Sequence, residues 1–265
     1  MHPFYLINAF STEPFGGNPA AVLLLPGSAW PETAWMQGVA AQFNLAETAF
    51  ALPQADGSFG LRWLTPLDEV DLCGHATLAT AHALWQTGVL AVDAEARFET
   101  RSGRLTCTRL SDGRISMDFP ALPVRPIPTP ELALRALGLK AAAAYSDGTY
   151  LVLELADEAS VRAVQPDFGL LSQLEAWGTI LTAPGTAPID FVSRFFAPRK
   201  GVPEDPVTGS AHCRLAPFWA AKLKKNSFQA RQVSKRGGDL GLELEADRVR
   251  LVGRAVTVGH GDLQI

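Results

Sequence analysis

The sequence has 265 residues, of which 47% are hydrophobic and 19% are charged, which is typical of a globular protein with ample material for a core. The net charge of −4 argues against nucleic acid as the main partner, because proteins that track phosphates are usually basic. The first residues do not resemble a signal peptide, and no apolar run has the length of a membrane span. We therefore expect a soluble, cytoplasmic protein that does not bind membranes.

The first part of the chain is predicted to place strands around one central helix. Aromatic and branched residues predict strands at 4–10, 20–26, 59–65, 97–101, 103–110 and 114–119, and a helix is predicted at 31–41. A second helix is predicted from Gly74 to about Gly88. Because small or apolar residues lie on nearly every face of this helix, we expect it to be buried all round.

Residues 120–130 contain five prolines, which predicts a stiff linker. After it the plan repeats. Helices are predicted at 131–139, at 161–171 and from Gly209 to about Leu223, and strands are predicted at 150–155, 178–183, 190–196, 228–232, 241–245 and 249–258. Pro217 is expected to bend or loosen the last helix. We predict an α+β fold of two domains, 1–119 and 131–265, with a last strand that can return to the first domain.

Two segments, 71–77 and 204–212, are arranged alike. Each is predicted to form a tight glycine turn after an extended stretch and to open into a helix of small residues. When Gly74 is aligned with Gly209, His75 falls opposite Ser210. The unpaired N–H groups of a helix start form a site for a carboxylate or another anion. The chain therefore uses one motif twice, and we expect the two helix starts to face each other across an inter-domain cleft.

The residues near these motifs are suited to proton transfer. Glu47 lies among small and apolar residues, and such surroundings raise the pKa of a carboxyl group enough to make it a proton donor and acceptor. His75, at a helix start, can take part in the same transfer. Asp205 can accept a hydrogen bond from an amine or hydroxyl of the substrate, and Ser210 can bind a carboxylate. We predict proton transfer at carbon, with no cofactor.

Each of these residues also has a structural explanation. Glu47 could bond to backbone at a strand end, His75 could pack locally, and Asp205, before a proline, could only form a turn. Core packing is expected for His82 and for His212. Metal binding is not expected, because no third ligand type recurs with His82 and the three cysteines lack metal-ligand spacing. The repetition of the motif favours the functional explanation.

Four segments, 10–22, 46–50, 71–77 and 204–212, resemble motifs of the PhzF-like isomerase family of phenazine biosynthesis. The similarity extends to the loop at 236–238 and so covers nearly the whole chain. The resemblance implies a diaminopimelate-epimerase-like fold, in which two similar halves each wrap a sheet around a central helix. It also implies a homodimer without a cofactor.

The resemblance assigns roles to residues of this sequence. It places the acid–base glutamate on Glu47, the motif histidine on His75 and the substrate-contacting aspartate on Asp205, and we take these as the predicted catalytic residues. The predicted substrate-binding residues are Asn18, Gly74, Gly209 and Ser210. In the phenazine enzyme such groups shift a proton in a dihydro-hydroxyanthranilate. Here they predict the reaction type and a small carboxylic acid substrate.

Two other functions stay open. Related epimerases use two cysteines, one at each helix start, and here Cys73 lies at the first place while Thr208 occupies the second. A proton shuttle through Glu47 is therefore favoured over a two-thiol racemase, although an amino-acid epimerase that uses Cys73 with Glu47 is an alternative. The other alternative is a binding protein for small acids that has lost turnover. The presence of Glu47, His75 and Asp205 together argues against it.

Overall fold

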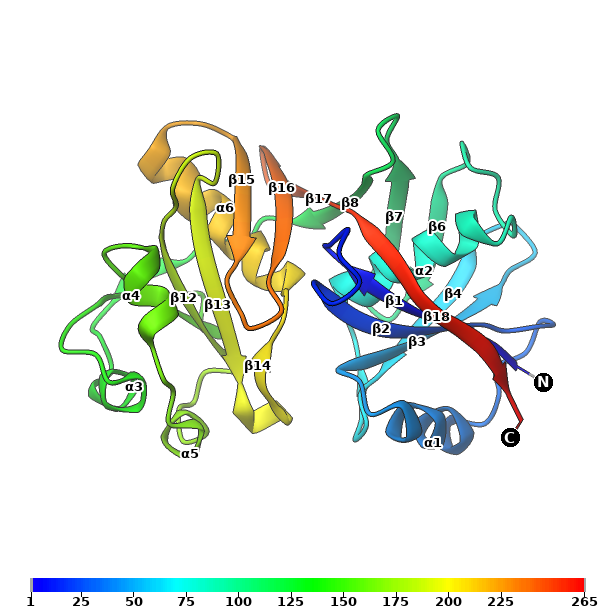
Figure 1. Cartoon of the computed structure of the whole chain (residues 1–265), viewed down its shortest axis with the longest axis horizontal. Helices are drawn as coiled ribbons and strands as arrows, with labels where there is room; N and C mark the ends of the chain where they lie inside the picture. Colours follow the sequence, from blue (N-terminus) through cyan, green and yellow to red (C-terminus); the bar gives the residue numbers. More distant parts are fainter. Residues whose placement is uncertain (1, 265) are drawn as a thin grey trace. The chain divides into compact units, whose positions relative to one another are not determined.

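The computed structural model describes residues 2–264, and the chain forms two compact units, whose helices and strands are labelled in Figure 1. The first unit contains the chain up to Phe119 and again from Val252, and the second contains Pro120–Leu251. Residues 120–130, which we expected to link the domains, thus lie within the second unit. Among residues 2–264 there is no helical segment with the length and hydropathy that a bilayer crossing requires.

The first unit is a mixed sheet with one helix at its centre. Its elements are β1 (His2–Ala9), β2 (Asn18–Leu24), α1 (Thr33–Phe43), β3 (Glu47–Pro53), β4 (Phe59–Leu64), β5 (Glu69–Val70), α2 (Gly74–Gln86), β6 (Ala96–Thr100), β7 (Gly103–Arg109), β8 (Ile115–Pro120) and β18 (Ala255–Leu263). β2 is parallel to β3 and β4 is parallel to β6. The pairs β1–β18, β1–β2, β3–β4, β6–β7 and β7–β8 are antiparallel.

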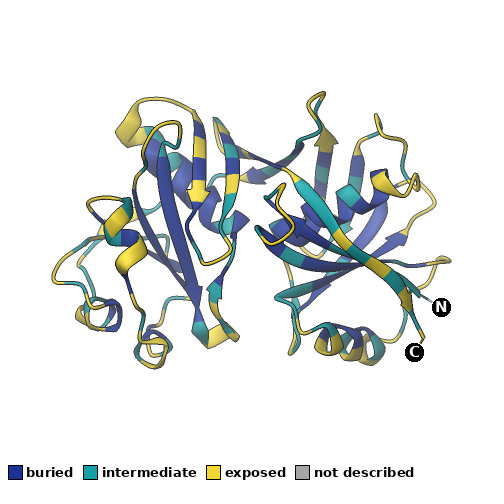
Figure 2. Cartoon of the chain, in the orientation of Figure 1, coloured by how far each residue is buried: buried dark blue, intermediate teal, exposed yellow. Residues whose placement is uncertain are grey.

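Helix α2 is the buried centre of this unit, as the sequence predicted (Figure 2). Ten of its residues are buried, from His75 to Ala81 and from Ala83 to Trp85. The helix packs against β1, β2 and β3. Its buried hydroxyls are satisfied by the helix backbone, since Thr77 Oγ1 donates to Cys73 O at 2.6 Å and Thr80 Oγ1 to Ala76 O at 2.7 Å.

The second unit repeats the strand plan of the first. Its elements are β9 (Arg125–Ile127), α3 (Glu131–Leu137), β10 (Ala143–Ser146), β11 (Tyr150–Glu154), α4 (Glu158–Ala163), α5 (Phe168–Leu171), β12 (Gly178–Pro184), β13 (Phe191–Ala197), η1 (Pro198–Lys200), β14 (Val202–Asp205), α6 (Gly209–Leu223), β15 (Ser227–Gln232), β16 (Gly238–Glu245) and β17 (Arg248–Gly253). β11 is parallel to β12 and β13 is parallel to β15, while β10–β11, β12–β13 and β15–β16 are antiparallel. This order matches β1 to β7, with α6 in the place of α2.

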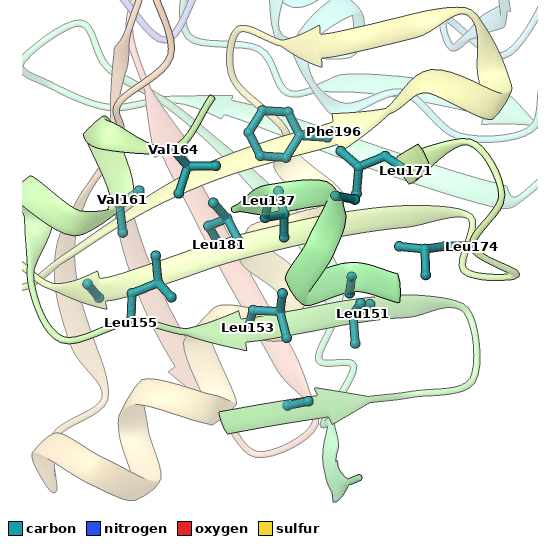
Figure 3. Packing of buried hydrophobic residues seen from close by; sticks show 14 of the residues in the cluster. Leu137, Leu151, Leu153, Leu155, Val161, Val164, Leu171, Leu174, Leu181 and Phe196 are labelled. Carbon is teal, nitrogen blue, oxygen red and sulfur yellow. The ribbon is translucent and has the colours of Figure 1, made fainter. Parts of the chain in front are cut away.

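Both faces of the second sheet are covered by helices. On one face, α6 packs with its Trp219 ring stacked on Phe191 and its Trp219 Nε1 donating to Thr182 Oγ1 at 3.0 Å. On the other face, α3, α4 and α5 cover an aliphatic cluster that Figure 3 shows from close by, around Leu153, Leu181 and Phe196. Phe191 and Phe196 of β13 thus lie on opposite faces of the sheet, one against α6 and the other in the cluster under α3, α4 and α5, because side chains of a strand alternate between its faces.

Three features differ from the expectations. Part of the predicted linker forms β9, which pairs with β10 and so joins the second sheet. The strand expected at 249–258 divides into β17 and β18 at Arg254, because the Arg254 carbonyl accepts bonds from the N–H groups of Phe10 at 2.7 Å and Ser11 at 3.3 Å. Helix α6 continues through Pro217.

A pair of leucines tests the core of the first unit. Leu64 is 0% exposed and packs beneath α1 with Phe50 and Met36, whereas Leu67, in the loop after β4, is 81% exposed. We expect Leu64→Ala to lower the free energy of unfolding by about 2–5 kcal/mol, because it leaves a cavity. Leu67→Ala is expected to change it by less than about 0.5 kcal/mol. Urea denaturation measures both, and equal effects would show that this core is wrongly assigned.

Candidate functional site

In the first unit, the fold brings three of the predicted site residues together. Asn18 is the first residue of β2, Glu47 is the first residue of β3, and these strands are parallel neighbours, so both side chains lie at the same end of the sheet. His75 is the second residue of α2, after Gly74 at its start. Asn18 and His75 are buried, while 16% of the Glu47 side chain is exposed.

The turn that places Asn18 at the start of β2 requires a glycine just before it. Gly17 has a φ of +69°, and a Cβ atom there would lie 2.3 Å from the Ala9 carbonyl oxygen. Only glycine tolerates both the left-handed backbone and that close approach. Gly17 is therefore a requirement of the turn that leads into β2.

His75 connects Asn18 and Glu47 through its two ring nitrogens. The Asn18 amide Nδ2 donates to Nδ1 at 3.1 Å, so Nδ1 is the acceptor and the ring proton lies on Nε2. Nε2 lies 3.3 Å from Glu47 Oε2. Burial lowers the pKa of His75 to about 3, which keeps the ring neutral at physiological pH. A neutral imidazole thus lies against a carboxylate, in a contact that does not have hydrogen-bond geometry.

Cys73 adds a third reactive group to this cluster. It precedes α2 in extended conformation, and its Sγ lies 3.5 Å from His75 Nδ1. Donor atoms of Glu47, Cys73 and His75 all lie within 4.8 Å of one another, a set that spacing in the sequence did not indicate. A metal ion here would have to displace a contact of His75, because one ring nitrogen faces Asn18 and the other faces Glu47.

In the second unit, Asp205 is held by a buried polar network. Thr208 Oγ1 donates to Asp205 Oδ2 at 2.5 Å. The Gln232 side chain, which is 0% exposed, donates to the Asp205 carbonyl at 2.7 Å and accepts from the Thr208 N–H at 2.9 Å. The three residues fix the turn before α6 and aim the Asp205 carboxylate. Nothing in the sequence marked Gln232, because it joins the network only through the pairing of β15 with β13.

Ser210, the second residue of α6, lies in another network that the sequence did not reveal. Its Oγ lies 3.1 Å from Tyr150 Oη, and its carbonyl accepts from Arg214 Nη1 at 3.0 Å. Arg214 also forms an ion pair with Asp147 at 2.5 Å. Burial acts to raise the pKa of Asp147, but hydrogen bonds from the Tyr150 N–H, Arg214 and the Thr149 N–H outweigh it and lower the pKa.

The starts of α2 and α6 are alike in backbone and different in side chains. Cys73 and Thr208 precede them with φ and ψ of −143° and 111°, and of −116° and 104°. In the part of the chain that the structure describes, neither side chain caps its helix. The side chain before each helix therefore accepts no hydrogen bond from the N–H groups of the first turn, and an anion site requires these N–H groups.

The repeat also shows which carboxylates are unique. In the first unit, Glu47 of β3 is the strand partner of the third residue of β2. In the second unit, Ile180 of β12 is the strand partner of the third residue of β11. In the second unit, Asp205 pairs with Phe195 of β13. The matching residue of the first unit is Trp63 of β4, and its partner is Val70. Each unit thus has one carboxylate at a place where the other has an aliphatic residue.

Of the two histidines expected to pack in a core, His212 is buried, whereas His82 is only partly buried, so that expectation was wrong for His82. His212 is 0% exposed, its Nδ1 lies 2.8 Å from the Thr208 carbonyl, and its ring stacks on Phe191. Burial lowers its pKa to about 4, against a smaller raising effect of the bond to Thr208. Core packing is confirmed for His212.

Comparison with known proteins identifies relatives across the chain. A family model described as phenazine biosynthesis-like protein (PhzC-PhzF) matches residues 7–261. A Halalkalibacterium halodurans protein named "Uncharacterized isomerase BH0283" is 45% identical over 263 residues, 98% of each chain. The crystal structure of a PhzF family protein from Enterococcus faecalis is 41% identical, with a TM-score of 0.93 over 100% of this chain and 99% of that one. A predicted epimerase from Pseudomonas aeruginosa, 21% identical over 100% of both chains, shares the fold with a TM-score of 0.78.

These matches confirm the predicted family and the epimerase-like α+β fold. The name of the Halalkalibacterium protein agrees with the prediction of an isomerase.

Stability should depend on pH through the buried histidines. Both have folded pKa values below the ordinary 6.5, about 3 for His75 and about 4 for His212, so each must gain a proton on unfolding below pH 6.5. The contribution of these neutral histidines to the free energy of unfolding is therefore complete above pH 6.5, and it is lost as the pH falls towards their folded pKa values. From pH 7 to pH 5 we expect a loss of about 2 kcal/mol per histidine. Denaturation across this range should show a weaker pH dependence in His212→Asn than in the unsubstituted protein.

Metal removal should have no effect on the first cluster. Because both ring nitrogens of His75 already have polar contacts, we expect dialysis against a chelator to leave the melting temperature unchanged. Added Zn²⁺ should not raise it. A Zn²⁺-dependent rise that Cys73→Ala abolishes would contradict this expectation, since a ligand that binds the folded state stabilises it.

Proposed function

Because this chain belongs to the phenazine biosynthesis-like PhzC-PhzF family, we propose that it is an isomerase that shifts a proton within a small carboxylic acid. The observation that carries the proposal is the contact between Glu47 and His75. A carboxylate and an imidazole lie 3.3 Å apart at the start of a buried helix, and the carboxylate is still partly exposed. General acid–base catalysis needs a positioned proton carrier that a substrate can reach, and the partly exposed Glu47 carboxylate beside His75 supports that role.

In this mechanism Glu47 takes a proton from one carbon of the substrate and returns it to another. His75 is neutral and its Nε2 lies 3.3 Å from one oxygen of Glu47, so after a small adjustment of the side chains Nε2–H can donate to that oxygen during the transfer. Asn18 maintains this tautomer by donating to Nδ1. Glu47 is therefore the proton carrier, while His75 and Asn18 orient it, and the mechanism uses no cofactor.

The substrate carboxylate is proposed to bind at helix N-termini, where N–H groups and the helix dipole favour an anion. The residues assigned to it are Gly74, Gly209 and Ser210. Asp205, held by Thr208, is proposed to accept a bond from an amine or hydroxyl of the substrate. That the residues of both units act on one substrate stays a prediction, as do the homodimer and the cytoplasmic location.

An amino-acid epimerase is the second candidate, because Cys73 lies 3.5 Å from His75 Nδ1. In such enzymes a thiolate acts as the base and a thiol as the acid, and a nearby imidazole can form the thiolate by accepting its proton. Against it, Nδ1 already accepts a bond from Asn18, and Thr208 stands at the second thiol position with its hydroxyl bonded to Asp205. Full activity in Cys73→Ala would exclude this candidate.

The proposal predicts isotope exchange that depends on Glu47. The protein is incubated in deuterated water with a panel of small carboxylic acids, including dihydroanthranilate analogues, and NMR detects deuterium at carbon. Glu47→Gln should slow the exchange by about a hundredfold or more, because it removes the proton carrier. Glu99→Gln is the matched control, since Glu99 is a surface residue of the same unit that pairs with Arg104.

Three outcomes separate the candidate functions. Exchange lost in Glu47→Gln and kept in Glu99→Gln supports the isomerase. Exchange that survives Glu47→Gln contradicts the assigned proton carrier. An acid that binds without any exchange at carbon would show a binding protein instead.

A further inference from the structure

Tyr150 occupies the place in the second unit that Asn18 occupies in the first. Each is the first residue of its strand, β11 or β2, and each contacts the second residue of the following long helix. Asn18 Nδ2 lies 3.1 Å from His75 Nδ1, and Tyr150 Oη lies 3.1 Å from Ser210 Oγ. The fold therefore uses the same position twice to orient the side chain at the second helical residue.

The Tyr150 ring is held from both sides. The Trp177 ring stacks on it at 5.3 Å with an interplanar angle of 8°, and the Arg214 guanidinium lies 3.7 Å from its centroid. Both groups cannot fit over one face, so the ring lies between an indole and a cation. Arg214 is itself fixed by Asp147 and by the Ser210 carbonyl. The hydroxyl of Tyr150 is thus positioned by a rigid group of side chains.

The hydroxyl of Tyr150 stays protonated. Burial raises its pKa to about 12, although the bond to Ser210 and the charge of Arg214 act in the opposite direction. A protonated phenol is a hydrogen-bond donor, and Ser210 Oγ is its neighbour at 3.1 Å. When Tyr150 donates to Oγ, the hydrogen of the Ser210 hydroxyl is left for another acceptor.

We propose that Tyr150 is a positioning residue that orients the Ser210 hydroxyl as a donor to the carboxylate of the substrate. This inference rests on the proposed function, which assigns Ser210 to that carboxylate. Tyr150 acts through Ser210, and its ring packing keeps the donor in place before the ligand arrives. Such preorganisation strengthens binding because less freedom is lost when the ligand binds.

The test uses anthranilate as a probe, with aniline as its analogue without a carboxylate. Tyr150→Phe keeps the ring and removes only the hydroxyl, and we expect its Kd for anthranilate to rise about five- to tenfold. The matched control is Tyr145→Phe, which removes a hydroxyl that donates to Glu154 Oε2 at 3.2 Å in the same unit. Ser210→Ala should weaken binding similarly, and the double variant should bind as Ser210→Ala does, because Tyr150 acts through Ser210.

The outcomes distinguish this inference from the proposed function. Glu47→Gln should lose isotope exchange but keep its anthranilate affinity, whereas Tyr150→Phe should lose affinity and, for an exchanged acid, raise KM with little change in kcat. An anthranilate affinity unchanged in Tyr150→Phe, or lowered additively in the double variant, overturns the inference and leaves the proton carrier untouched. Absence of anthranilate binding to the wild-type protein also overturns it. A loss of exchange confined to Glu47→Gln supports only the proposed function.

Discussion

Burial of α2 over most of its surface is the constraint on which the first unit depends. A helix enclosed by strands has no face left for charged side chains, and its threonines satisfy their hydroxyls on the helix backbone itself. Polar chemistry can then reside only at an end of the helix. The N-terminal end is the useful one, because its N–H groups attract anions and because the parallel strands β2 and β3 begin beside it. Asn18, Glu47 and His75 meet there for this reason.

The two units show how a repeated motif diverges while its backbone is kept. The strand order and the extended residues before α2 and α6 are shared, but the side chains at matching positions differ. His75 corresponds to Ser210, Asn18 to Tyr150, and Cys73 to Thr208. Glu47 has Ile180 as its counterpart, and Asp205 has Val70. Glu47 and Asp205 are thus carboxylates that one unit has and the other lacks at the matching position.

Buried polar groups of the second unit hold the turn before α6 and the first turn of that helix. Gln232 satisfies the backbone on both sides of the turn before α6, and the Arg214–Asp147 pair satisfies the Ser210 carbonyl and the N–H of Tyr150. Leaving one of these groups unpaired in a dry interior costs about 1–3 kcal/mol, so each network is stable only when it is complete.

The sequence alone determined the family motifs, the two buried helices and most strands, because these depend on local periodicity and on glycine turns. It did not determine that β9 would replace a linker, or that Arg254 would divide the last strand, since both depend on hydrogen bonds between distant segments. It named Glu47 and His75 from their motifs, but the tautomer and the neutral state of His75 follow from Asn18 and from burial. Tyr150, Arg214 and Gln232 carry no local signal. Only the tertiary structure assigned them, because strand pairing and helix packing bring Tyr150 and Gln232 to the start of α6 and bring Asp147 to Arg214 within that helix.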